Sequence, residues 1–289
     1  MNVDVWKPMY DENFDPTRYL YHYTNLDKAI KILHSESFIF SQIRGTNDTS
    51  ESKLKISYKG DLSIDDPSIL DEKIKKVDKF FKENIGFIRL LCFSMDVPIP
   101  DNDKPKVQQF LEKDHRNKFC DIKWRGFALP RMWAQYATNN EGVCFIVNKE
   151  KLDRQIKKKT AFYKPSKVRY NRFFESYEIS KEQLDELCEK ITIARRTMFT
   201  NMIRDDDFFV EYNFFSKSDD WINEHEFRYI TAVDNVEDIV RVDGLFDYLE
   251  GVVVGESIDP AYKKVIELLL GKKVQVMNIV FGNTISKLI

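Results

Sequence analysis

The stretch Tyr21-His22-Tyr23-Thr24-Asn25-Leu26-Asp27 is typical of a strand that runs directly into a helix. Residues 17–23 are β-prone, and Asn25 or Thr24 is a good helix N-cap. Apolar residues then recur at helical spacing, at Leu26, Ala29, Ile30 and Leu33. We therefore expect His22 at a strand-to-helix junction, where a side chain is held rigidly beside a cleft. The structural alternative is a buried histidine whose ring nitrogens are satisfied by the backbone.

The composition is that of a globular protein. The chain has 289 residues, of which 43% are hydrophobic and 13% aromatic, and this is enough to fill a sizeable core. Its 45 basic and 47 acidic residues give a net charge of −2, so no global steering toward nucleic acid or membrane is expected. No linker rich in Gly, Pro or Ser divides the chain. We expect one α+β domain over residues 1–289, with helical insertions near 66–84, 103–137 and 180–205.

Apolar periodicity and turn residues predict the remaining elements. Strands are expected at 37–41, 85–93, 143–147, 226–233, 239–242, 251–255 and 274–281. Helices are expected to start at 66 and to cover 131–137, 180–204 and 260–270.

Cysteine usage and the N-terminal residues indicate the compartment. The four cysteines lie far apart without a CxxC pair, so buried reduced thiols are expected rather than disulfides or a zinc site. They are Cys92, Cys120, Cys144 and Cys188. Residues 1–4 lack the basic and apolar segments of a signal peptide, and no run approaches the roughly 18 apolar residues of a membrane span. We expect a cytoplasmic protein that does not span a membrane, and we make no prediction of its oligomeric state.

Residues 149–172 form a strongly basic tract, with ten Lys or Arg against two acidic residues. Aromatic residues are interleaved with them, a pattern that suits single-stranded nucleic acid. The candidate nucleic-acid contacts are Lys157, Lys158, Lys159, Lys164, Lys167 and Arg169. The structural alternative is a solvated helix face.

Three adjacent aspartates, Asp205-Asp206-Asp207, could hold a divalent cation or could simply end a helix in a polar loop. Because no second ligand group is evident nearby, we predict no metal.

Two carboxylates, Glu224 and Glu226, flank His225 at the beginning of a predicted strand. A period of two would place both on one face. Like charges held together raise at least one pKa, and carboxylates projected into a cleft suit acid/base work or stabilise a developing cation. The structural alternative is an edge-strand ion pair with Arg228 on the same face.

Five groups of residues, in their order and spacing, resemble the bacterial family catalogued as domain of unknown function 2971. The resemblance runs from about residue 19 to about residue 270, and the family name implies no reaction. The groups are His22-Tyr23-Thr24; Phe40 with Asn47-Asp48 and Glu51; Cys92-Phe93-Ser94; Met132-Trp133-Ala134-Gln135-Tyr136 with Gly142-Val143-Cys144; and Trp221 with Glu224, Glu226 and Arg228.

A more distant resemblance is to the ADP-ribosyltransferase fold. The segment Leu20-Tyr21-His22-Tyr23-Thr24, followed by a helix and a short strand, is similar to the start of that fold, and Glu-x-Glu at a strand start is similar to its third motif. The resemblance implies mixed or antiparallel sheets with helical insertions, and NAD as co-substrate without a metal.

The same resemblance implies roles for individual residues. His22 would bind a ribose hydroxyl of NAD, Thr24 would help to hold the nicotinamide side, and Glu226 would orient the nicotinamide ribose. The expected catalytic residues are therefore Glu226, His22 and Glu224. Those expected to contact the cofactor are His22, Tyr23, Thr24, Tyr136 and Arg228. Tyr23 replaces the glycine that follows the histidine in the poly-ADP-ribosylating branch, and Tyr136 is the candidate for stacking on nicotinamide.

Three functions are consistent with these patterns. The leading hypothesis is an NAD-dependent ADP-ribosyltransferase-like enzyme that acts on a protein or nucleic acid, with a toxin or a phage-defence effector as its setting. The first alternative is a non-catalytic module that binds a nucleotide or a partner. The second is a nucleic-acid-processing protein that uses the tract 149–172. The chain lacks a Gly-x-Ser-x-Gly elbow, a Walker loop and a Gly-x-Gly-x-x-Gly fingerprint, which disfavours serine-hydrolase, ATPase and Rossmann functions.

Overall fold

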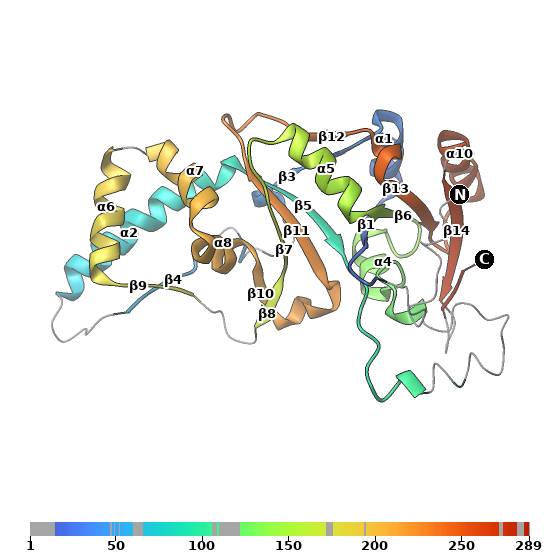
Figure 1. Cartoon of the computed structure of the whole chain (residues 1–289), viewed down its shortest axis with the longest axis horizontal. Coiled ribbons are helices and arrows are strands. Elements are labelled where there is room, and N and C mark those ends of the chain that lie inside the picture. The colour runs from blue at the N-terminus through green and yellow to red at the C-terminus, as the bar shows by residue number, and fades with distance from the viewer. Residues whose placement is uncertain are drawn as a thin grey trace.

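The computed structural model describes residues 15–46, 48, 50–51, 53–59, 66–105, 109, 122–171, 176–193, 195–271, 274–281 and 286–288. These residues form a mixed sheet with helices packed against it and a further group of helices at one end (Figure 1). The fold class is α+β, as the sequence predicts. None of the helices in these ranges is long and apolar enough to cross a bilayer.

The α-helices are α1 (Leu26–Ser35), α2 (Pro67–Asn84), α4 (Pro130–Tyr136), α5 (Lys149–Lys159), α6 (Lys181–Ile193), α7 (Arg195–Asp205), α8 (Asp207–Phe214), α9 (Leu245–Tyr248) and α10 (Pro260–Leu270). Short 3-10 helices are η2 (Ile43–Gly45), η3 (Ile85–Phe87), η4 (Ile122–Trp124) and η5 (Asp219–Glu224). The strands are β1 (Tyr19–Thr24), β2 (Ser37–Ile39), β3 (Ser41–Gln42), β4 (Ile56–Tyr58), β5 (Ile88–Ser94), β6 (Val143–Asn148), β7 (Lys164–Lys167), β8 (Arg169–Asn171), β9 (Tyr177–Ile179), β10 (Ser216–Ser218), β11 (Glu226–Ala232), β12 (Arg241–Asp243), β13 (Leu249–Val254), β14 (Gln275–Phe281) and β15 (Ser286–Leu288).

The main sheet has the strand order β15-β14-β13-β6-β1-β5-β11-β7, and β3 also pairs with β5. β13 and β14 run parallel, whereas the other neighbours in this sheet run antiparallel. Three smaller pairs, β8 with β10, β4 with β9 and β2 with β12, lie outside it. The expectation of mixed sheets is therefore confirmed.

The main sheet is divided between β1 and β5. β1 pairs with β6 along its whole length, and β5 pairs with β11 along its whole length. Between β1 and β5 the only register pair among the described residues is Tyr21↔Ser94, and β3 takes up the same edge of β5 at Leu90. The ladder is therefore interrupted along residues 91–93, and the sheet consists of two halves that meet at one point.

Three hydrophobic clusters stabilise these halves. The first cluster lies where α1, α5, α9 and α10 pack on the sheet, and it contains Leu20, Phe93 and Phe145 from three central strands. The second joins α2, α6, α7 and α8, the helices gathered at one end in Figure 1, to β5 and β11. The third packs the tyrosines of β1 against Trp133 of α4. The first cluster therefore spans both halves of the sheet, whereas the second lies on the β5–β11 half and the third on the β1–β6 half.

Most predicted elements are present, with small shifts at their ends. The junction after β1 is confirmed, because Asn25 accepts a hydrogen bond from the backbone N–H of Lys28 at the start of α1. The strand expected from residue 85 begins only at Ile88, after η3. Helices are present near 66–84 and 180–205, whereas the segment 103–137 lies partly outside the described residues.

The prediction of one long helix over 180–204 is wrong, because this segment forms α6 and α7. Both helices pack along α2: Lys73 pairs with Asp185, and the rings of Phe80 and Phe199 lie 5.8 Å apart. A straight helix would advance about 21 Å between residues 185 and 199, but α2 advances only about 10 Å between its two contacts. The segment therefore bends to follow α2.

Three cysteines are free thiols, and Cys144 and Cys188 are buried, as the sequence predicts. Cys92 is half-buried, and Cys120 lies outside the described residues.

Gly142 lies directly before β6 and allows the backbone to approach β1 closely. A substitution there tests the packing between β6 and β1. A Cβ on Gly142 would lie 2.3 Å from the carbonyl oxygen of Thr24 and 2.8 Å from the Cα of Ala137, so Gly142→Ala forces the backbone apart. We expect the free energy of unfolding to fall by about 1–3 kcal/mol in urea denaturation. Gly45→Ala is the matched control, because nothing lies within 4 Å of a Cβ there. Equal stability of the two variants would contradict this packing.

Candidate functional site

A cavity of about 600 Å³ lies where β1 and β5 separate. It is lined by residues of β1, α1, β2, β5, α4, β10 and β11, together with the end of η5 and the loop near residue 51. Every residue that the sequence predicted for catalysis or cofactor binding lines this cavity. These are His22, Tyr23, Thr24, Tyr136, Glu224, Glu226 and Arg228.

The predicted residues reach the cavity from two faces of the sheet. Register pairs place Tyr21, Ser94 and Glu226 opposite one another on neighbouring strands, so their side chains share a face. Because side chains alternate along a strand, His22 points to the other face. There its ring contacts the rings of Phe38 at 4.9 Å and Phe93 at 5.6 Å. A ligand that touches both His22 and Glu226 must therefore pass through the opening between the two strands.

His22 bridges the two halves of the sheet. Its Nδ1 lies 3.0 Å from the carbonyl oxygen of Cys92, on the edge of β5 where the ladder is interrupted. A carbonyl oxygen only accepts, so Nδ1 carries the proton and Nε2 has a lone pair. Burial lowers the pKa of His22, which favours the neutral ring. The backbone-bonded alternative for this histidine is thus confirmed at one nitrogen.

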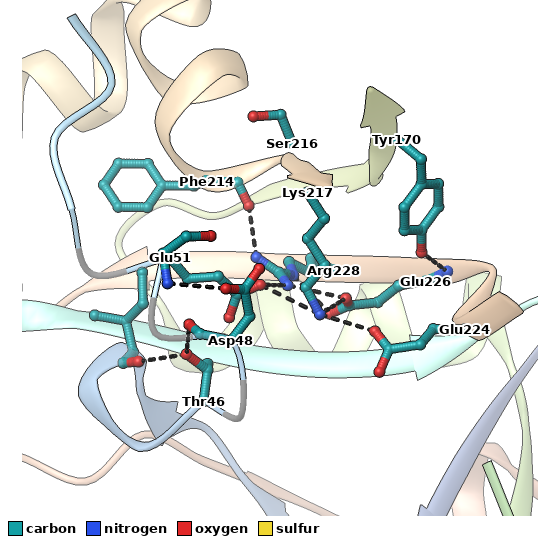
Figure 2. A network of polar contacts seen from close by, with 12 residues as sticks. Thr46, Asp48, Glu51, Tyr170, Phe214, Ser216, Lys217, Glu224, Glu226 and Arg228 are labelled. Atoms are coloured by element: carbon teal, nitrogen blue, oxygen red, sulfur yellow. Dashed lines mark hydrogen bonds and ion pairs between the residues drawn. The ribbon is translucent and has the colours of Figure 1, made fainter. Parts of the chain in front are cut away.

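A buried network of ion pairs lies on the other face (Figure 2). The Nε and Nη2 of Arg228 donate to the two carboxylate oxygens of Glu226 at 2.6 and 2.9 Å, and Nη2 also donates to Glu51. The Nη1 of Arg228 donates to the carbonyl oxygen of Phe214 at 2.8 Å. The expected pair between Glu226 and Arg228 therefore exists. It is nearly inaccessible to solvent, because β7 rather than β11 forms the edge of the sheet.

Lys217 of β10 is the centre of this network. Its Nζ lies 2.8 Å from Glu224, 2.8 Å from Glu226 and 3.3 Å from Glu51. Burial opposes the charged form, yet the neighbouring carboxylates raise the pKa of Lys217 above its usual value. For Glu226, burial alone would raise the pKa, but Arg228 and Lys217 together lower it to about 2. Both groups are therefore ionised at neutral pH.

The expectation that Glu224 and Glu226 share a strand face is wrong. Glu224 ends η5, and His225 between the two carboxylates has a φ of 45°, in the left-handed region. This turn directs both carboxylates toward Lys217, although Glu224 is not part of β11. The Tyr136 hydroxyl of α4 donates to Glu224 at 2.7 Å. Burial and the Glu224 carboxylate raise the pKa of Tyr136, so this phenol stays protonated.

Lys217, Glu51 and Ser94 are site residues that sequence reasoning did not single out. A lysine between two serines gives no local signal, and only the fold brings it to three distant carboxylates. Glu51 and Ser94 were noted as parts of the family resemblance without a role. Both line the cavity.

The predicted nucleic-acid contacts lie elsewhere, along α5, β7 and β8. Three of them already form ion pairs: Lys159 with Asp243, Lys164 with Asp207, and Arg169 with Glu211. Lys157, Lys158 and Lys167 are exposed. Binding of nucleic acid by this tract stays a prediction.

The three adjacent aspartates have structural contacts. Asp205 pairs with Arg204, Asp206 caps α8, and Asp207 pairs with Lys164. No group of His, Cys, Asp or Glu within the described ranges has the arrangement of a metal site.

Comparison with known proteins gives one family. Residues 132–229 match the model of the family described as Protein of unknown function (DUF2971), which confirms the predicted resemblance over this segment. The matched segment runs from α4 into β11, so it contains Tyr136, Lys217, Glu224, Glu226 and Arg228. No curated protein and no solved structure matches the chain significantly.

Removal of the central cation should destabilise the fold. Lys217→Met leaves three buried carboxylates with one charged partner fewer, and we expect the free energy of unfolding to fall by about 3–5 kcal/mol. Lys157→Met, at an exposed position of α5, should change it by no more than about 0.5 kcal/mol. Urea denaturation measures both values. A loss below about 1 kcal/mol for Lys217→Met would show that the network contributes little to stability.

Glu226 should also contribute to acid unfolding. Its pKa is lower in the folded protein, at about 2, than the ordinary value of 4.5. Its stabilisation is therefore fully present above about pH 4.5 and is lost as the pH falls toward 2. The free energy of unfolding of Glu226→Gln, measured in urea between pH 2 and 6, should be lower at pH 6 and should vary less with pH. An unchanged slope would contradict the low pKa.

Proposed function

We propose that this cavity, a cleft between β1 and β5, binds NAD and that the protein transfers the ADP-ribosyl group to a protein or nucleic acid. The observation that carries this proposal is the convergence of His22, Thr24, Tyr136, Glu224 and Glu226 in one cavity, although they come from three separate parts of the chain. The resemblance of β1 and of the Glu-x-Glu segment to the ADP-ribosyltransferase fold had implied these residues.

The lining of the cavity is compatible with a dinucleotide. Its volume of about 600 Å³ lies within the usual range of small-molecule sites. Lys28 and Lys31 of α1 line it and are exposed, so they are available to the phosphates. Tyr136, which is half-buried, supplies aromatic surface for a base.

In the proposed reaction the glycosidic bond between the ribose C1′ and the nicotinamide nitrogen breaks. Nicotinamide leaves as a neutral molecule with the bonding electron pair, and positive charge develops at C1′. A lone pair of the acceptor then forms the new bond to C1′, and the acceptor releases its proton to solvent. Glu226 and Glu224 are the carboxylates available to stabilise the developing charge. A neutral His22 and the protonated Tyr136 can hydrogen-bond to the sugar hydroxyls and to nicotinamide.

A second candidate is a module that binds a nucleotide without turnover. It is favoured by the engagement of Glu226, whose two carboxylate oxygens are already held by Arg228 and Lys217. Cations next to a carboxylate offset its negative charge, so the carboxylate stabilises a cationic transition state less well. Binding without release of nicotinamide would support this candidate.

The test is incubation of the purified protein with NAD labelled in the adenylate part, with and without cell lysate and nucleic acid. Nicotinamide release and transfer of label should both fall by at least about 100-fold in His22→Ala and Glu224→Gln. Lys79→Ala, on the exposed surface of α2, is the matched control and should retain full turnover. Circular dichroism checks that the variants are folded. No turnover and no NAD binding by the wild-type protein would overturn the proposal.

A further inference from the structure

Among the described residues, two buried carboxylate oxygens of neighbouring side chains have no hydrogen-bond partner, one in the lining of the cavity and one that does not line it. Oε2 of Glu51 and Oδ2 of Asp48 are both buried and both lack a partner. The Glu51 side chain is 1% exposed and lines the cavity, with its other oxygen bound by Arg228. Figure 2 shows Glu51 and Asp48 beside Arg228. Because a buried acceptor without a donor is costly, this end of the cleft is suited to a ligand that brings donors.

The charges around this end do not balance. The acidic groups are Asp48, Glu51, Glu224 and Glu226. The basic groups that interact electrostatically with them are Lys55, Lys217 and Arg228. Four carboxylates against three cations leave a formal charge of −1. A net negative charge away from bulk water favours a cationic group on the ligand.

Lys55 does not compensate for the missing donor. Its Nζ donates to the carbonyl oxygen of Ser216 at 2.7 Å and to the hydroxyl of the same residue at 3.2 Å. Burial lowers the pKa of Lys55 to about 8, so it is mostly charged at neutral pH and is already counted among the cations. Ser94, which also lines the cavity, adds a buried hydroxyl without a partner. Among the described residues, the lining of the cavity therefore presents one unpartnered acceptor, Oε2 of Glu51, and the unpartnered hydroxyl of Ser94, beside a network with one excess negative charge.

We infer that Glu51 is a specificity-determining residue that selects a ligand group bearing both positive charge and N–H donors. The inference rests on the proposed function, under which the ligand is a nicotinamide dinucleotide. Only its oxidised form has a positively charged ring, and the carboxamide of that ring supplies N–H donors. The cleft should therefore bind NAD⁺ in preference to NADH, and ADP-ribose should bind independently of Glu51.

The experiment is isothermal titration calorimetry of NAD⁺, NADH and ADP-ribose. Glu51→Gln keeps an oxygen acceptor for Arg228, replaces the unpartnered oxygen with an NH₂ group and removes one negative charge. The wild-type protein should bind NAD⁺ at least about tenfold more tightly than NADH, as expected for one charge-assisted contact. Glu51→Gln should reduce this preference to less than about threefold and leave the affinity for ADP-ribose unchanged.

Two further variants separate charge from folding. Glu178→Gln removes one negative charge at an exposed residue of β9 and should keep the full preference for NAD⁺. Glu51→Asp keeps the charge and should also retain a preference for NAD⁺. If Glu51→Gln does not fold, as judged by circular dichroism, Glu51→Asp and the wild-type preference decide the question. Equal affinity of the wild-type protein for NAD⁺ and NADH would overturn the inference and leave the proposed function standing.

A separate comparison applies if the wild-type protein binds none of the three nucleotides, which would overturn the proposed function. The probes are then 1-methylnicotinamide, a cation, and neutral nicotinamide, followed by saturation-transfer NMR. A preference for the cation that is lost in Glu51→Gln supports the selection by Glu51. Equal binding of the two probes, or binding of neither, overturns it.

Discussion

The structure depends on the single backbone pair between β1 and β5, Tyr21↔Ser94. Here two halves of a sheet are joined without a continuous ladder, and one hydrophobic cluster spans both of them. The interruption opens the cavity, and the side chain of His22 replaces part of the missing ladder by bonding to the Cys92 carbonyl. A continuous ladder at this place would leave no opening between the faces of the sheet. The cavity therefore exists because β1 and β5 form no ladder hydrogen bonds along residues 91–93.

The same arrangement explains why so many charges are buried in one place. A buried carboxylate is tolerated only with a partner, and Lys217 and Arg228 serve several carboxylates each. The network also fixes positions, because Glu224 comes from η5, Glu51 from a loop and Glu226 from β11. Charges shared in this way hold three separate segments at one end of the cleft. The site is consequently part of the core rather than an addition to its surface.

Local signals made the strand-to-helix junction predictable. An N-cap at Asn25 and apolar residues at helical spacing depend only on near neighbours, and α1 formed as expected. The residues expected at the site also line one cavity. By contrast, no sequence period could predict Lys217, whose partners are set by the fold, or the left-handed turn at His225 that reorients Glu224. Likewise, the bend between α6 and α7 follows from packing on α2.

An interrupted strand edge usually carries a risk, because exposed N–H and C=O groups can pair with another chain and begin aggregation. In this protein the free edge of β5 lies inside the molecule. Leu91 and Phe93 are only 3% and 2% exposed, and the rings of His22 and Phe38 cover this part of the strand. A second chain has no access to it, whereas a small molecule in the cleft does. The burial of this edge therefore prevents β5 from pairing with a second chain. The cavity beside it still admits a ligand.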